Sequence, residues 1–194
     1  MGGKSYTGKG DGGSSGLGDG RRARKSEPVF EAVGMLDELN AVIGMAKAEA
    51  RRAGAARMAP GPEETAGGED GQLAAIQSDL FEAGSFLSGY RHAEEAEGAF
   101  ARKLKRLEEW IDGMDEKLPP LSNFILPGGC AMSARLHHAR TVCRRAERRV
   151  EALDVPAKKQ VLPYLNRLSS YFFARARLEN LNAGVEETAW KGKE

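Results

Sequence analysis

The chain has 194 residues, and its 29 Lys and Arg residues nearly balance its 28 Asp and Glu residues, for a formal net charge of +1 at pH 7. This length suits one domain with a sizeable core. The balanced charge disfavours a protein that works mainly by coating nucleic acid, and no stretch approaches the roughly 18 apolar residues of a membrane span. With only two cysteines, a disulfide framework or a cysteine-rich zinc site is not expected.

Residues 1–28 form a glycine-rich segment ahead of the first expected helix, with nine glycines in the first 20 positions. No apolar stretch of a secretory signal follows Met1, so we expect an intracellular protein, in the cytoplasm of a bacterium or the mitochondrial matrix of a eukaryote. Glycine lets backbone N–H groups approach an anion, and the segment adds the hydroxyls of Thr7, Ser14 and Ser15 and the charge of Lys9. A polyphosphate would suit these groups, although the Gly-Lys-Ser/Thr order of a Walker A loop is missing. The alternative is a glycine-rich tail with no function.

Apolar residues at three- and four-residue steps predict helices over residues 29–52, 72–89, 95–118, 131–153 and 157–182. The glycine- and proline-rich stretch at 53–71 is expected to be a flexible insert. Because no strand-like alternation of useful length competes, the fold class is all-α: a five-helix bundle over residues 29–182, followed by a C-terminal tail at 183–194.

The fourth expected helix is strongly basic, and six arginines fall between residues 135 and 149 with Glu147 as the only acid among them. His137, Arg140, Arg144 and Glu147 follow steps of three and four residues, so they share one helix face. Arginine offers bidentate donors suited to phosphate, which favours an anion site. A solvated basic face with ordinary ion pairs is the alternative, and binding to nucleic acid is a weaker one, because no aromatic residues interleave.

Three other features are ambiguous on the residues alone. Asp37 lies in a helix interior, where Asp is unfavourable, and is expected as a surface charge, an acid–base group or the partner of a helix arginine. Phe124 lies in the apolar loop LSNFILPGG, and its spacing favours an anchor in the core. His138 and Cys143 have no partners at metal-ligand spacing and are expected to be structural.

Five segments, taken in order, resemble the PduO-type ATP:cob(I)alamin adenosyltransferases, or corrinoid adenosyltransferases: YT-x-x-GD-x-G, VFEAVGMLDELNAVIG, LPPLSNFILPGG, ARTVCRRAERRV and YLNRLSSYFFARAR. The match runs from Tyr6 to about Arg177 and breaks at the insert and at residues 89–100. The resemblance implies a homotrimer of five-helix bundles with active sites between adjacent subunits. It implies transfer of the 5′-deoxyadenosyl group of ATP to cob(I)alamin, with release of triphosphate and with Mg²⁺ accompanying ATP.

The resemblance also implies roles for individual residues. Those that would hold the nucleotide are Thr7, Gly8, Lys9, Gly10, Ser14, Ser15, Lys25, Arg144, Arg145, Ala146, Glu147, Arg148 and Asn166. Within this set, Glu147 would lie near the ribose or the Mg²⁺ ion. Asp37 and Arg140 match an ion pair on the corrin side, and Phe124 matches an aromatic residue that displaces the lower axial ligand of the corrinoid. Arg144 completes this catalytic set by holding the departing phosphates.

The sequence departs from the family pattern at three positions. Gly8 stands where the family usually has a basic residue and Gly12 where it often has Lys, so Lys9 is the candidate to replace a missing charge. Phe86 stands where an acid or a small polar residue is common. The alternative function is a non-catalytic nucleotide- or cobalamin-binding or delivery protein. Partners expected beyond the trimer are a cob(II)alamin reductase and an adenosylcobalamin-dependent enzyme, with no nucleic acid and no membrane.

Overall fold

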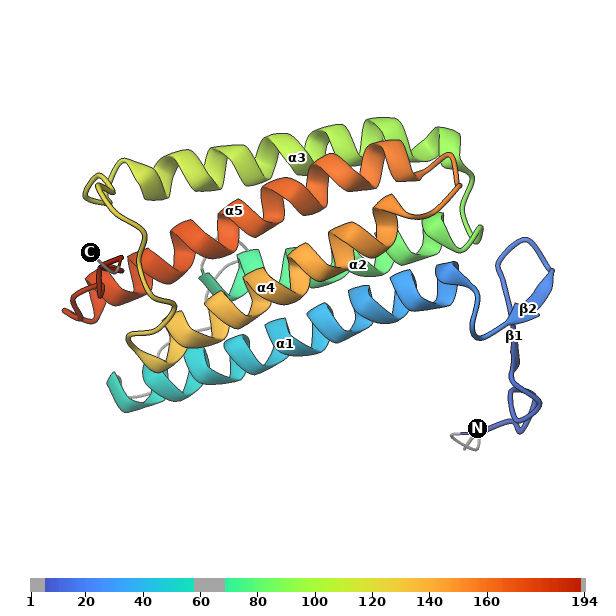
Figure 1. Ribbon diagram of the computed structural model, residues 1–194, viewed down its shortest axis with the longest axis horizontal. Helices are drawn as coiled ribbons and strands as arrows, with labels where there is room; N and C mark the ends of the chain where they lie inside the picture. The colour runs from blue at the N-terminus through green and yellow to red at the C-terminus, as the bar shows by residue number, and fades with distance from the viewer. Residues whose placement is uncertain (1–5, 58–68, 193–194) are drawn as a thin grey trace.

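Five helices run along the long axis of the chain, and a small β-hairpin stands at one end of them (Figure 1). The computed structural model describes residues 6–57 and 69–192. The elements are β1 (Ser14–Gly16), β2 (Arg22–Arg24), α1 (Pro28–Arg57), α2 (Glu69–Leu87), α3 (Ala93–Asp115), α4 (Ala131–Glu151) and α5 (Lys158–Asn182). The prediction of a five-helix, all-α bundle is therefore confirmed.

The ends of the first two helices differ from the expectation. Residues 53–57 continue α1 and residues 69–71 begin α2, although both were assigned to the flexible insert. The remainder of the insert, residues 58–68, lies outside the described residues. Residues 53–57, AGAAR, are mostly Ala, the residue with the highest helix propensity, so the helix continues past residue 52 despite Gly54.

The β-hairpin was not predicted. Its strands pair antiparallel, with Ser15 opposite Ala23, and Gly20 closes the turn with a φ of +83°. The hairpin docks on the end of α2, where the Gly18 N–H donates to the Ser88 carbonyl at 2.9 Å. A Cβ at Gly18 would stand 2.1 Å from the Tyr90 nitrogen, so only glycine permits this approach.

The two central helices, α1 and α4, run antiparallel and are joined by ion pairs along their length. Glu31 pairs with Arg149 at 3.4 Å, Glu49 pairs with Arg135 at 3.2 Å, and Glu38 with Arg145 lies between them. The apolar face of α4 packs into the core and carries Leu136, Ala139, Val142, Cys143, Ala146 and Val150. Burial raises the pKa of the Cys143 thiol, as expected for a structural cysteine.

The departure at Phe86 is explained by packing. Its side chain is buried in the core, 6.1 Å from the Phe100 ring in an edge-on arrangement. The Arg91 guanidinium lies 4.5 Å from the Phe86 ring centroid. Phe86 therefore fills the space between α2 and α3, a structural role.

No helix within residues 6–57 and 69–192 is both long and apolar enough to cross a membrane.

A buried carboxylate ties α2, α3 and α5 together. Asp79 is only 2% exposed, and it accepts hydrogen bonds from Lys103 at 2.8 Å, from the Tyr164 hydroxyl at 2.8 Å and from Arg106. Removing one partner of such a network leaves uncompensated charge in a low-dielectric environment.

We predict that Asp79→Ala lowers the free energy of unfolding by about 3 kcal/mol, because Lys103 and Arg106 lose their shared partner. Tyr164→Phe removes one hydrogen bond and should cost about 1 kcal/mol. Urea titrations of both variants measure the difference. Equal losses for the two variants would contradict the assignment of Asp79 as the centre of the network.

Candidate active site

The arginines of α4 fall into two rows. Arg135, Arg145 and Arg149 face α1 and pair with its glutamates. Arg140, Arg144 and Arg148 follow at four-residue steps and have no acidic partner within the described residues. The interpretation as ordinary ion pairs is therefore confirmed for the first row. The second row forms no ion pair within the described residues, and its role as an anion site stays a prediction.

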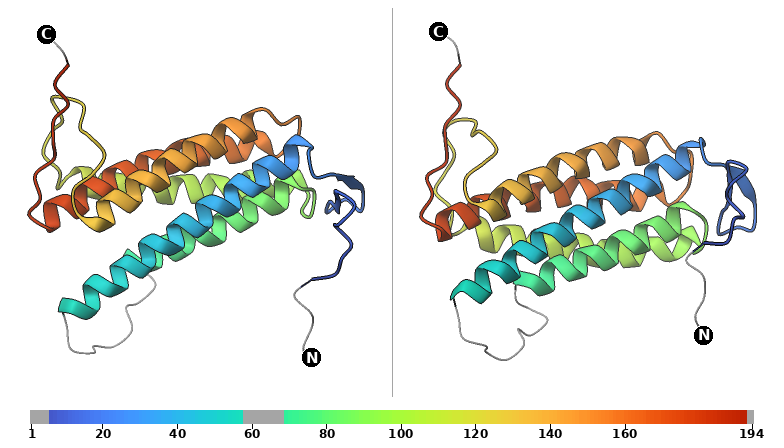
Figure 2. Two further views of the ribbon diagram at one scale, coloured as in Figure 1. Left: turned by 60° about the horizontal axis from the view of Figure 1, so that its bottom comes forward. Right: turned by 90° about the horizontal axis from the view of Figure 1, so that it is seen from below.

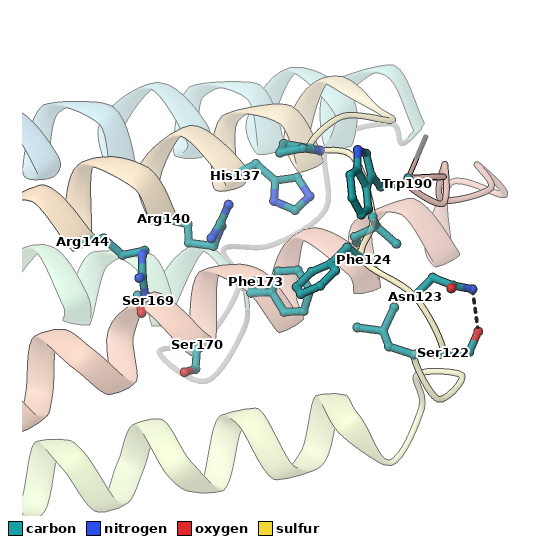
Figure 3. A pocket seen from close by; sticks show the side chains of 14 residues that line it. Ser122, Asn123, Phe124, His137, Arg140, Arg144, Ser169, Ser170, Phe173 and Trp190 are labelled. Carbon is teal, nitrogen blue, oxygen red and sulfur yellow. Dashed lines mark hydrogen bonds between the residues drawn. The ribbon is translucent and has the colours of Figure 1, made fainter. Parts of the chain in front are cut away.

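The larger of two pockets beside this second row has a volume of about 900 Å³. It lies between α4, α5, the loop 121–127 and the C-terminal tail, and its residues include Phe124, Arg140, Phe173 and Trp190 (Figure 3). The Phe124 side chain is 81% exposed, and its ring meets the Trp190 ring edge-on at 6.5 Å. The interpretation of Phe124 as a core anchor is therefore wrong, and the side chain is available to a ligand.

Two polar side chains in the wall of this pocket lack hydrogen-bond partners within the described residues. His137 is 3% exposed and neither ring nitrogen is satisfied, and the Arg140 Nε is also buried without a partner. Burial and the nearby Arg140 charge lower the pKa of His137, so its imidazole is neutral at pH 7. Burial and the Arg144 charge likewise lower the pKa of Arg140. Buried polar groups are normally satisfied, so these two indicate that something else completes the pocket.

The second pocket has a volume of about 500 Å³, is lined by four charged residues together with Leu162 and Pro163, and adjoins the first through Arg144, which lines both. Its other residues include Glu147, Arg148 and Asn166, all three expected in the nucleotide site. The Asn166 amide donates to the Glu147 carboxylate at 2.9 Å, which fixes the two side chains relative to each other. The structure therefore brings four predicted site residues together at one cleft.

Three other predicted residues lie elsewhere. Asp37 is exposed on α1 and forms no ion pair with Arg140 inside the described chain, so the expected pair is not made within one subunit. The reason is geometric, because Arg140 lies in the wall of the larger pocket, beside Phe173. Arg145 belongs to the row that faces α1, and Ala146 is fully buried in the core.

The glycine-rich loop places its predicted residues around two tight turns. The Asp11 N–H donates to the Gly8 carbonyl at 3.2 Å and the Gly13 N–H to the Gly10 carbonyl at 3.1 Å. Gly8 and Gly13 have φ values of +69° and +75°, a conformation that favours glycine. Lys25 lies over the loop, since a Cβ at Gly10 would stand 3.0 Å from the Lys25 Nζ. Thr7, Lys9, Ser14 and Ser15 lie along the same segment and its first strand.

Arg22, the first residue of β2, was not among the residues predicted for the nucleotide site. Its guanidinium donates to the Lys9 carbonyl at 2.8 Å, to the Ser14 carbonyl at 3.1 Å and to the Ser14 hydroxyl at 2.8 Å. It holds the loop closed and places a positive charge beside it. Only its position in the basic run 21–25 could have drawn attention to it.

The two halves of the predicted nucleotide site are not joined within one chain. Between residues 7–25 and α4, the described residues form no hydrogen bond or ion pair. The loop instead contacts the end of α2 and the start of α1. Within residues 6–57 and 69–192, no three His, Cys, Asp or Glu side chains gather as a metal-binding group.

Comparison with known proteins gives consistent matches over nearly the whole chain. Residues 5–179 match the family described as cobalamin adenosyltransferase. The corrinoid adenosyltransferase of Bacillus subtilis is 40% identical, covering 97% of this chain and 92% of that protein. The corrinoid adenosyltransferase MMAB of Homo sapiens is 40% identical, covering 95% and 72% respectively.

A solved structure shares the fold. It is a variant of the PduO-type ATP:corrinoid adenosyltransferase from Lactobacillus reuteri, complexed with cobalamin and ATP. Its TM-score to this chain is 0.77 with 29% identity, over 97% of this chain and 100% of that one. The resemblance noted in the sequence is confirmed, and this chain belongs to the cobalamin adenosyltransferase family.

Proposed function

We propose that this chain transfers the 5′-deoxyadenosyl group of ATP to cob(I)alamin and releases triphosphate. The observation that carries the proposal is the position of Arg144 on the boundary between a cleft lined by charged residues and a larger pocket whose wall includes Phe124, Phe173 and Trp190. A reaction that joins a nucleotide to a large macrocycle needs two such adjoining spaces. The complex of the Lactobacillus reuteri relative with cobalamin and ATP supports this pairing of ligands.

The protein itself forms no covalent bond in this reaction. The cobalt of cob(I)alamin is the nucleophile, a Co–C bond forms to the ribose C5′, and the C5′–O bond breaks with its electron pair leaving on triphosphate. The protein must align the two reactants and stabilise the departing negative charge. Arg144 and Arg148, exposed and without acidic partners within the described residues, are the groups suited to that charge. Arg145 would contribute less to that charge, because its guanidinium already forms an ion pair with Glu38.

The separation of the loop from α4 supports a site built between subunits. We propose that the Tyr6–Lys25 segment of one subunit closes over the Arg144 cleft of the next in a homotrimer. In the same arrangement the exposed Asp37 would meet the half-buried Arg140 of a neighbour, whose Nε has no hydrogen-bond partner within the described residues. A carboxylate there would satisfy the Arg140 guanidinium and fix its orientation beside the corrinoid.

Magnesium would arrive with ATP in this proposal. Mg²⁺ is commonly held by one or two carboxylates and by substrate phosphates, with no all-protein cage needed. Glu147 and Glu151 line the cleft one helical turn apart and could supply such carboxylates. The ion would neutralise phosphate charge that the arginines leave uncovered.

The intracellular location, the reductase and the enzyme that receives the product stay predictions.

The direct test mixes the purified protein with MgATP and chemically reduced cob(I)alamin and follows the visible spectrum. We expect conversion to adenosylcobalamin with one triphosphate released for each product formed. ATP binding without conversion would instead favour the non-catalytic binding or delivery protein, for which the uncharged Gly8 and Gly12 give some support.

Arg144→Ala tests the role of the unpaired row. The variant should lose about 3 kcal/mol of transition-state stabilisation, a loss of roughly a hundredfold or more in kcat/KM, because a donor to the leaving group is removed. Arg149→Ala is the matched control on the same helix, since Arg149 already pairs with Glu31, and it should stay within a few fold of wild type. Equal effects of the two substitutions would refute a special role for Arg144.

Phe124→Ala tests the aromatic wedge. With ATP and cob(II)alamin, the wild-type protein should give the four-coordinate spectrum, because the Phe124 ring occupies the space of the lower axial ligand. The variant should keep the five-coordinate, base-on spectrum while its KM for ATP changes little. A four-coordinate spectrum from the variant would defeat the wedge role.

A further inference from the structure

The loop that carries Phe124 is fixed at both of its ends by α5. The Arg177 guanidinium, only 6% exposed, donates to the Pro119 carbonyl at 2.7 Å. The buried Asn180 accepts from the Cys130 N–H at 3.0 Å and donates to the Gly128 carbonyl at 3.2 Å. Gly129 has a φ of +104°, and a Cβ there would stand 2.1 Å from the Asn180 Oδ1. Neither Arg177 nor Asn180 reaches the exposed middle of the loop, where Phe124 lies.

The middle of the loop is held by the C-terminal tail instead. The Leu126 N–H donates to the Thr188 carbonyl at 2.8 Å, and the Trp190 N–H donates to the Phe124 carbonyl at 2.7 Å. Ile125 and Ala189 form an antiparallel bridge between these two bonds. Figure 2 shows the loop and the tail side by side at one end of the bundle, projecting sideways from the helices. The backbone of Phe124 is thus paired with the tail, and its ring contacts the Trp190 ring.

The tail is itself clamped to α5 through Arg177. The Arg177 Nε donates to both carboxylate oxygens of Glu187, at 3.0 and 3.2 Å, and the Val185 N–H donates to the Asn180 carbonyl at 2.9 Å. One buried guanidinium therefore holds the start of the loop and the tail at once. The adjacent Glu186 is exposed and forms no ion pair within the described residues.

We infer that residues 185–190 are a positioning element that sets the Phe124 ring in the corrinoid pocket. The Glu187–Arg177 pair anchors this element to α5, and the contact between the Trp190 and Phe124 rings fixes the position of Phe124. The inference rests on the proposed function, in which Phe124 displaces the lower axial ligand. Because Trp190 also lines the pocket, tail and loop together form its outer wall. The tail was expected from sequence only as a terminal segment without a role.

The test compares two pairs of variants, Glu187→Gln with Glu186→Gln and Trp190→Ala with Trp190→Phe. The readouts are the four-coordinate fraction of cob(II)alamin with MgATP, the KM values for ATP and for the corrinoid, and the melting temperature. Glu187→Gln and Trp190→Ala should each reduce the four-coordinate fraction at least threefold and leave the KM for ATP within twofold. Glu186→Gln should match wild type, and Trp190→Phe should restore most of the four-coordinate fraction. Adding Trp190→Ala to Phe124→Ala should produce no further loss, because both act on the same ring.

Each contrary result distinguishes failure of this inference from failure of the Phe124 wedge. An undiminished four-coordinate fraction in both Glu187→Gln and Trp190→Ala would overturn the inference while leaving the Phe124 wedge intact. Parallel losses in ATP affinity and melting temperature would also overturn it, because they would show a general structural role. A wild-type protein that gives no four-coordinate species would overturn the wedge itself, and the inference with it, whatever the variants do.

Discussion

Three arginines follow one another along one face of α4, Arg140, Arg144 and Arg148, and none of them forms an ion pair within the described residues. Like charges at such spacing on a helix repel one another, so this face favours binding of an anion. The arginines of the opposite row of the same helix form ion pairs with Glu31, Glu38 and Glu49 of α1. The buried apolar face of α4 holds the helix in the bundle, one arginine row adds ion pairs to α1, and the other row has no ion-pair partner within the described residues.

The rest of the site follows from that asymmetry. Asn166 on α5 orients Glu147 beside the unpaired row, in the cleft lined by charged residues. The larger pocket lies toward the start of α4, where Phe173, Phe124 and Trp190 join Arg140 in its wall. A row of positive charge that runs into an aromatic pocket suits a reaction in which a polyphosphate leaves and a large, largely apolar macrocycle gains a substituent. The loop and tail that form the outer wall are tied to the same α5 through Arg177 and Asn180.

The helices and most of the cleft could be predicted from the sequence because they depend on local periodicity. Apolar steps of three and four residues located all five helices, and the spacing of Arg144, Glu147 and Arg148 placed them near one another. The division of the arginines into paired and unpaired rows could not be predicted, because it depends on the register between α1 and α4. Arg22 and Glu187 act through contacts with backbone and side chains distant in sequence, which no local pattern reveals.

Other features of the structure could not be predicted from the sequence, for different physical reasons. The hairpin strands are three residues each, too short for an alternation signal, and the tight turns that precede them depend on individual glycines. Asp37 and Arg140 were expected to pair, yet within one chain they lie on different faces. In the proposed homotrimer, that pairing and the closure of the loop over the cleft would both form between subunits. A pattern within one sequence can suggest which residues pair, but it leaves open which subunit each residue comes from.

The central claim is that Arg144 and Arg148, the two members of the unpaired row that line the smaller cleft, bind the triphosphate part of the nucleotide. The most direct measurement is calorimetric titration of the protein with inorganic tripolyphosphate at increasing salt, with adenosine as the uncharged comparison. The account predicts saturable tripolyphosphate binding that weakens as salt rises, and an increase in melting temperature because the ligand binds only the folded state. Adenosine should bind much more weakly at every salt concentration. An absence of tripolyphosphate binding at low salt, with the row intact, would contradict the account.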